Sequence, residues 1–319
     1  MTTSLSKDRF RGVLLGAAIG DAMGMPFQFL HPQLIHELVP LPPRTFLRAP
    51  QGHLNARLEK GQYTDETQLM TLVTETILEK GDADAAEIAL GLVRLYETRA
   101  WITPGRSLLA ACRHLRKGTP WHEAGGFRDG SKPLAFVPPL ALRHHPDGER
   151  MARHCASLAR MILVEPRVSA GCACFGLLLQ NILMCRDSRE LPDAVQTTAD
   201  RMQASHPEFR DMLLWVLSLL DVEVAEGLQE LGTGYSILES LFAALFVFLK
   251  FPDDFTAAVS HVVHAGDSSD TTGFVAGAFG GAFNGFDGIP ENLFSGLKDA
   301  QFFLDLADRL YSLSSSAAS

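Results

Sequence analysis

The 319-residue sequence lacks the features of a secreted or membrane-spanning protein. Its N-terminus has no apolar core of the signal-peptide kind, and its longest apolar runs, such as Leu241 to Leu249, are too short to cross a bilayer as a helix. The five cysteines are irregularly spaced, and Cys172 and Cys174 have no second pair that would complete a zinc site. We therefore expect small, buried, reduced cysteines, no membrane partner and a cytoplasmic location.

An excess of positive charge is also missing. The formal net charge of −9 disfavours nucleic-acid binding, which depends on neutralising phosphates with Lys and Arg, so we expect no nucleic-acid partner. Hydrophobic residues make up 46% of the chain and charged residues 20%, which is typical of a globular protein. An anionic ligand would need a local source of positive charge, and a bound cation would provide one.

Sustained alternation of apolar and polar residues, the mark of a strand, is absent. Apolar residues recur instead at helical spacing, which predicts an all-α protein. We expect one domain over residues 1–313 and a disordered tail over residues 314–319, with long loops at 39–52 and 121–139, where Pro and Gly gather. The expected helices are Thr67 to Leu78, Asp84 to Tyr96, Arg106 to Leu115, Gly148 to Met161, Val168 to Met184, Leu191 to Met202, Phe209 to Leu220, Ile237 to Leu249 and Phe255 to Val263.

Glycines at a spacing of four mark two segments. On a helix, Gly12, Gly16, Gly20 and Gly24 share one face, which another backbone can approach closely. Glycine costs roughly 1 kcal/mol per helical position against alanine, so a compensating packing gain is expected. A second such series, Gly273, Gly277 and Gly281, follows the segment His264 to Thr272. Asp21 lies near the end of the first series and, on this segment alone, is best interpreted as a solvated or capping aspartate.

Two oxygen-rich segments precede predicted helices. In the first, Thr64 is suited to cap a helix whose first turn holds Asp65 and Glu66, where carboxylates interact well with the helix dipole. The same side chains would suit a hard cation such as Mg²⁺, and both interpretations stay open. In the second, Asp267 and Asp270 flank two serines, more than capping requires. Asp65 and Asp267 are 202 positions apart, so only the fold could bring the two segments together.

Taken in order, three segments resemble the signatures of the ADP-ribosylglycohydrolase family. They are Gly16 to Gly24, the sequence Thr-Asp-Glu-Thr at Thr64 to Thr67, and Gly266 to Thr271 with the sequence Gly-Asp-Ser-Ser-Asp-Thr. The similarity extends from about Phe10 to Gly285. The resemblance implies a compact, single-domain orthogonal bundle of helices with two magnesium ions at its centre. It further implies a magnesium-dependent hydrolase that cleaves the N- or O-glycosidic bond between ADP-ribose and a protein side chain or small conjugate.

The resemblance also assigns roles to individual residues. It implies that the catalytic residues are Asp65, Asp267 and Asp270, and that the residues near the ligand are Asp21, Gln28, Gly234 and Tyr235. The implied metal-binding residues are Thr64, Asp65, Glu66, Asp267, Asp270 and Thr271.

Several positions depart from the family pattern. Glu66 stands where the family usually has aspartate, and a second serine separates Asp267 from Asp270. Gln28 replaces a frequent acidic residue, and the segment from Asp129 to Phe136 replaces the usual loop. A relative that only binds ADP-ribose or a partner therefore stays an alternative to the enzyme. Phosphohydrolase chemistry lacks a matching His-Asp arrangement, because His144 and His145 are expected at the surface.

Overall fold

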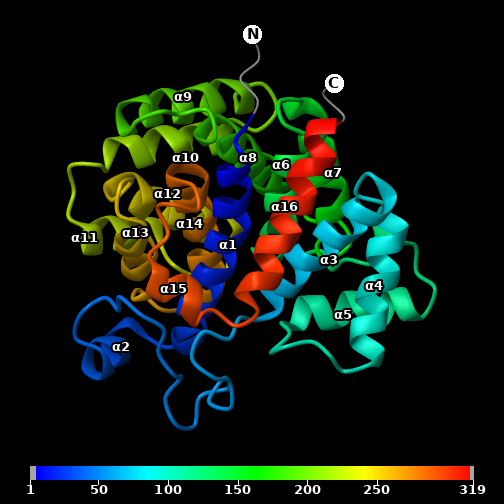
Figure 1. Ribbon diagram of the computed structural model, residues 1–319, viewed down its shortest axis with the longest axis horizontal. Helices are drawn as coiled ribbons and strands as arrows, with labels where there is room; N and C mark the ends of the chain where they lie inside the picture. The colour runs from blue at the N-terminus through cyan, green and yellow to red at the C-terminus, as the bar shows by residue number, and fades with distance from the viewer. Residues whose placement is uncertain (1–4, 317–319) are drawn as a thin grey trace.

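The computed structural model describes residues 5–316, and every regular element in that range is a helix (Figure 1). Its one isolated β-bridge joins Gly126 and Leu163. The helices are α1 (Lys7–Gly24), η1 (Met25–Phe27), α2 (Pro32–Leu38), α3 (Asp65–Lys80), α4 (Ala85–Glu97), α5 (Arg106–Arg116), η2 (Trp121–Glu123), η3 (Lys132–Phe136), α6 (Val137–Arg143), α7 (Gly148–Ala159), α8 (Pro166–Ile182), η4 (Ser188–Glu190), α9 (Leu191–Met202), α10 (Pro207–Ser218), α11 (Val224–Leu231), α12 (Ile237–Lys250), α13 (Phe255–Val263), α14 (Ser269–Asn284), α15 (Glu291–Gly296) and α16 (Ala300–Ser316). The predicted all-α fold is confirmed.

Helices α1 and α14 pack against each other at the centre of the molecule (Figure 1), and the pairing of their glycines shows that they run in opposite directions. The glycines of the two series oppose one another: a Cβ on Gly12, Gly16 or Gly20 would lie within 2.2 Å of the carbonyl oxygen of Gly281, Gly277 or Gly273 respectively. Contact this close requires residues without side chains. The spacing of four therefore marked a backbone-to-backbone interface, as predicted.

The remaining helices enclose this central pair. Helices α12 and α13 cover one side of α14, and α16, α3 and α6 contact α1. The aromatic side chains of Phe248 and Phe279 stack with ring centroids 5.6 Å apart, and Phe175 meets Phe279 edge-on. All five cysteines are buried and free, as expected. Because the core surrounds α1 and α14, the ends of these two helices are held in fixed positions.

Some sequence expectations need correction. The loop expected at 121–139 contains η2 and η3, and α6 begins at Val137. Pro138 and Pro139 fit there because the first turn of a helix needs no backbone N–H donors. Helix α16 continues to Ser316, three residues into the expected tail, and residues 317–319 lie outside the described range.

No single helix within residues 5–316 has the length and apolar character needed to cross a membrane. Helix α1 with η1, taken together with α2, has sufficient length and apolar composition, but this pair is bent by 91°. Most of α1 is buried against the rest of the protein.

Candidate metal and substrate site

The first turns of α3 and α14 meet inside the protein. Thr64 caps α3, whose first two residues are Asp65 and Glu66, and Asp270 lies in the first turn of α14. Thr271 donates a hydrogen bond to Glu66 Oε1 and so joins the two helix starts directly. These five side chains are all buried, with at most 3% of their surface exposed. Residues about 200 positions apart in the sequence thus form one acidic cluster.

Asp21 fastens the start of α3 to α1. Its carboxylate accepts hydrogen bonds from the backbone N–H of Thr64 and Thr67 at 2.9 and 3.1 Å, and from their hydroxyls at 2.8 and 2.7 Å. Complete burial, together with repulsion from Asp270, raises the pKa of Asp21 to about 7. Asp21 therefore acts as a capping residue, but it lies on α1 and caps the start of α3.

Lys132 enters the acidic cluster from the first position of η3. Its Nζ lies 2.9 Å from Asp65 Oδ1 and 2.7 Å from Glu66 Oε1, and only 13% of its side chain is exposed. The surrounding carboxylates overcome the effect of burial and raise the pKa of Lys132 well above its usual value, so the side chain stays charged. Lys132 was not among the site residues predicted from the sequence. The one available signal was its position in the segment that departs from the family pattern.

Burial dominates the electrostatics of the other acidic side chains. It raises the pKa of Glu66 to about 8 and that of Asp270 to about 6, although Lys132 opposes both shifts. Asp65 is held from both sides, because its Oδ2 accepts a hydrogen bond from the backbone N–H of Gly105 at 3.1 Å while Oδ1 contacts Lys132. Glu66 Oε2, in contrast, is buried with no hydrogen-bond partner. This oxygen is available to a cation or a water molecule.

Gln28 connects Asp270 to a neighbouring loop. Its side-chain amide donates to Asp270 Oδ2, and its Oε1 accepts from Asn55 Nδ2 at 3.0 Å. Asn55 also donates to the backbone carbonyl of Met25 at 2.9 Å. Gln28 thus takes part in the acidic cluster through its neutral amide, which adds no further negative charge to the buried carboxylates.

Asp267 differs from Asp270 because it is exposed at the surface. Its backbone adopts a left-handed conformation with φ of 51°. Two backbone hydrogen bonds with the segment after η1 hold it there, Phe29 N to Asp267 O at 2.7 Å and Asp267 N to Leu30 O at 3.1 Å. The Asp267 carboxylate accepts a hydrogen bond from the Thr233 hydroxyl at 3.3 Å. Its described hydrogen bonds do not reach the buried carboxylates.

A cavity of about 740 Å³ opens onto the acidic cluster. Asp270, Thr271, Lys132 and Gln28 form part of its lining, and so do two arginines, Arg106 and Arg128, and two exposed aromatic residues, Phe29 and Tyr235. The predicted ligand residue Tyr235 therefore borders the cavity. Gly234 precedes it, where a Cβ would lie 2.3 Å from a carboxylate oxygen of Glu239. A volume of this size is typical of small-molecule sites.

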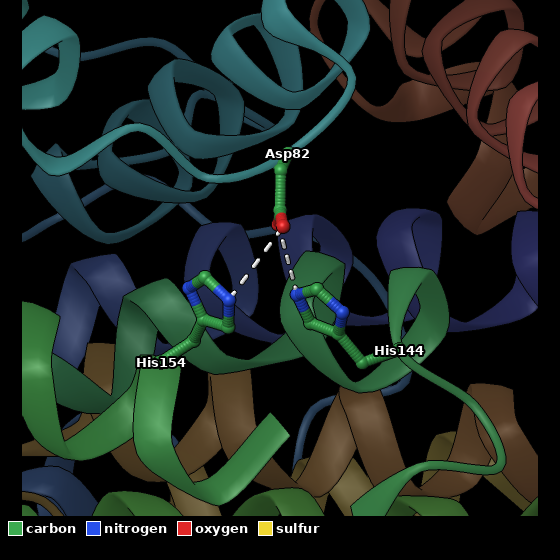
Figure 2. Close-up of side chains that lie close together, drawn as sticks. All are labelled: Asp82, His144 and His154. Carbon is green, nitrogen blue, oxygen red and sulfur yellow. Dashed lines mark ion pairs between the residues drawn. The ribbon is translucent and has the colours of Figure 1, made fainter. Parts of the chain in front are cut away.

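A second cluster of polar side chains lies elsewhere, with Asp82 just after α3, His144 just after α6 and His154 on α7. Figure 2 shows the rings of His144 and His154 side by side, both directed at the Asp82 carboxylate. His144 Nε2 is 3.1 Å and His154 Nε2 is 3.7 Å from an oxygen of Asp82. The expectation that His144 is a surface residue is wrong, since only 6% of it is exposed. Burial and the neighbouring His154 lower the pKa of His144 to about 4.

This second cluster is compact enough to hold a metal ion, because one ligand atom from each residue lies within 4.8 Å of the other two. The two imidazole rings are nearly parallel, however, with centroids 4.5 Å apart and 10° between their planes. Both imidazole Nε2 atoms already lie within ion-pair distance of the Asp82 carboxylate. Arg150 also contacts the Asp82 carboxylate. These features favour an ion-pair network.

Comparison with known proteins identifies the family. A family model described as ADP-ribosylglycohydrolase matches residues 2–318, so this chain belongs to the ADP-ribosylglycohydrolase family and is a hydrolase of that family. It is 25% identical to the ADP-ribosylarginine hydrolase Tri1 of Serratia proteamaculans over 334 residues, covering 97% of this chain and 80% of the relative. Identity is also 25% over 300 residues with the ADP-ribosyl-(dinitrogen reductase) glycohydrolase of Rhodospirillum rubrum, covering 93% and 92%. A solved structure titled "ADP-ribosylglycohydrolase-related protein complex" superposes with a TM-score of 0.73 at 25% identity, over 97% of this chain and 98% of that one.

Proposed function

We propose that this protein is a magnesium-dependent hydrolase that releases ADP-ribose from a modified protein side chain or a small conjugate. The observation that carries the proposal is the cavity whose lining joins an acidic cluster to two arginines. ADP-ribose has a ribose at one end, which would lie at the acidic cluster, and a pyrophosphate in the middle, which would lie at the arginines. The relatives described above are named as an ADP-ribosylarginine hydrolase and as a glycohydrolase of ADP-ribosyl-(dinitrogen reductase), which supports an ADP-ribose conjugate as the substrate here.

Each part of the cavity has a role in this proposal. The guanidinium groups of Arg106 and Arg128 bind the pyrophosphate, since arginine forms paired hydrogen bonds with phosphate oxygens. Their positive charge attracts an anionic ligand locally, although the whole chain has a formal net charge of −9. The exposed rings of Phe29 and Tyr235 contact the apolar faces of the ligand.

The reaction joins a water oxygen to the anomeric carbon of the ribose as the bond to the side chain breaks. The leaving group takes up a proton, so that ADP-ribose and an unmodified side chain result. Positive charge develops on the ribose in the transition state, and the carboxylates of Asp65, Asp267 and Asp270 are proposed to stabilise it and to direct the water. Asp270 is the one of these three that lines the cavity.

The chemistry of the donor groups fits a hard cation. Carboxylate and hydroxyl oxygens are the ligands that Mg²⁺ prefers, and one or two carboxylates are sufficient because Mg²⁺ usually retains several waters. The unpartnered Glu66 Oε2 is such an oxygen. The ligands implied by the family resemblance are Thr64, Asp65, Glu66, Asp267, Asp270 and Thr271. Of these, Glu66 and Asp270 support the proposal best, because Glu66 Oε2 has no partner and Asp270 lines the cavity. A bound magnesium ion would orient the ribose hydroxyls and lower the pKa of the attacking water.

Release of ADP-ribose tests the proposal. Arginine-, serine- and glutamate-modified proteins would be incubated with the enzyme, with and without magnesium, and free ADP-ribose measured by mass spectrometry. We expect magnesium-dependent release from at least one linkage, and loss of release in Asp270→Asn. Asp305→Asn, an exposed position on α16, serves as the matched control. If the wild type binds ADP-ribose yet releases it from none of these linkages, the non-catalytic alternative is correct.

A further inference from the structure

The residues of the acidic cluster do not fit two magnesium ions as they are arranged, because a protein cation already lies among them. We propose that the Lys132 ammonium permanently occupies one cation position, so that the site holds one divalent ion in place of two. This inference deepens the proposed function and rests on it for the identity of the remaining ion.

The Lys132 ammonium is in direct contact with two carboxylates of the acidic cluster. Lys132 Nζ contacts Asp65 Oδ1 and Glu66 Oε1 at 2.9 and 2.7 Å, and both carboxylates are fully buried. With the Gly105 N–H on its other oxygen, Asp65 has no carboxylate oxygen left without a partner. Glu66 keeps one free oxygen, Oε2. The cluster therefore has an unoccupied ligand atom on the Glu66 side and none on the Asp65 side.

The separation of the carboxylates gives the same result. Across residues 5–316, the one group of three Asp, Glu, His or Cys side chains with ligand atoms within 4.8 Å of one another is that of Asp82, His144 and His154. Asp65, Glu66 and Asp270 do not form such a group. Asp65 and Glu66 meet instead at the Lys132 ammonium, which also interacts with Asp270 through its charge.

The chain segments on both sides of Lys132 are held in place, which keeps its side chain at the acidic cluster. Pro133, Leu134, Ala135 and Phe136 follow it and are buried. The preceding segment is fixed by Asp129, whose Oδ1 accepts from the backbone N–H of Gly130 at 2.7 Å and of Ile237 at 3.2 Å. Both sides of Lys132 are therefore anchored, and its ammonium needs no loop movement to reach the carboxylates.

Counting bound ions tests this inference. Metal-free protein would be titrated with Mn²⁺ and the number of tightly bound ions per chain measured by electron paramagnetic resonance. We expect one ion in the wild type, two in Lys132→Ala, one in Lys132→Arg, which keeps the positive charge, and one in Lys117→Ala, an exposed lysine. Chelator should lower the melting temperature of Lys132→Ala more than that of the wild type, since a second ion then contributes to its stability.

Two bound ions in the wild type, or an unchanged count in Lys132→Ala, would overturn the inference. The wild-type count decides the matter even if Lys132→Ala fails to fold. The two proposals can fail separately. If the wild type binds two ions and releases ADP-ribose, the role of Lys132 is wrong and the hydrolase proposal holds. If it binds one ion and releases no ADP-ribose, the hydrolase proposal is wrong and the role of Lys132 holds. A wild type that binds no ion contradicts both.

Discussion

The backbone interface between α1 and α14 makes Gly20→Ala a demanding test of the fold. A Cβ built on Gly20 lies 1.8 Å from the carbonyl oxygen and 2.4 Å from the carbonyl carbon of Gly273. Real Cβ atoms essentially never approach another atom within 3.0 Å, and the obstructing atoms belong to a backbone. No side chain can rotate away, so α1 and α14 must separate along their contact.

The size of the effect follows from two opposing terms. Overpacking a core costs about 1–3 kcal/mol and occasionally more, and the upper end applies here because the clash is between backbones. Alanine recovers about 1 kcal/mol over glycine within a helix. We expect a net loss of about 2 kcal/mol. With an unfolding entropy of about 0.7 kcal/mol/K for a chain of this length, the melting temperature should fall by about 3 °C.

Gly91→Ala provides the matched control. Gly91 is also helical and buried, but its added Cβ would meet Leu72 Cδ1 at 2.3 Å, the end of a flexible side chain. We expect its melting temperature, measured by calorimetry, to change by less than half as much. If Gly20→Ala melts no lower than Gly91→Ala, the interface is not as tightly constrained as the geometry indicates. Gly20→Ala should also lower ADP-ribose release, because Asp21 and Asp270 lie at the facing ends of the two helices.

Three further predictions concern charge. Arg128→Ala should raise KM for an ADP-ribosylated substrate about tenfold with little change in kcat, as expected for loss of a charged hydrogen bond to phosphate. Steady-state kinetics would measure both constants, with Arg153→Ala as the control. An unchanged KM in Arg128→Ala would contradict the prediction. Glu66→Asp should lower ADP-ribose release or leave it unchanged, because the site is fitted to glutamate; a rise in activity at matched magnesium would refute this. The folded-state pKa of His144 is lowered to about 4 from 6.5, so the unfolded chain binds more protons between these values, and stability should fall as pH drops from about 6.5 toward 4. Urea denaturation would measure the free energy of unfolding at pH 7 and at pH 5. Between these pH values, His144→Gln should lose about 1–2 kcal/mol less of this free energy than the wild type. An equal loss in both proteins would contradict the lowered pKa of His144.

Much of the fold could be predicted because its signals are local. Helical periodicity identified most helices, and glycines at a spacing of four on α1 and α14 indicated a close backbone contact before its partner was known. Thr64 and the acidic residues after it have the composition of a helix start, which is what they form. Prolines were less informative: Pro138 and Pro139 indicated a loop, yet they lie in the first turn of α6.

The candidate site could be predicted only in part, because burial and pairing are properties of the fold. Asp267 and Asp270 look alike in the sequence, yet one is exposed and the other is 1% exposed. His144, in a segment rich in Pro and Gly, gives no local sign of being buried. Lys132 was missed for the same reason, since a lysine in a loop is ordinarily a solvated side chain.

The departures at Glu66 and Lys132 are best understood together. The family usually carries Thr-Asp-Asp-Thr where this chain has Thr64 to Thr67, and the segment containing Lys132 also differs from the usual loop. In the structure, Glu66 Oε1 reaches both Lys132 Nζ, at 2.7 Å, and the Thr271 hydroxyl. An aspartate at this position is shorter by one methylene and would leave the buried ammonium with Asp65 as its one close carboxylate. A buried charge with too few partners is strongly destabilising. We therefore expect the stability of the buried Lys132 ammonium to depend on the longer side chain of Glu66.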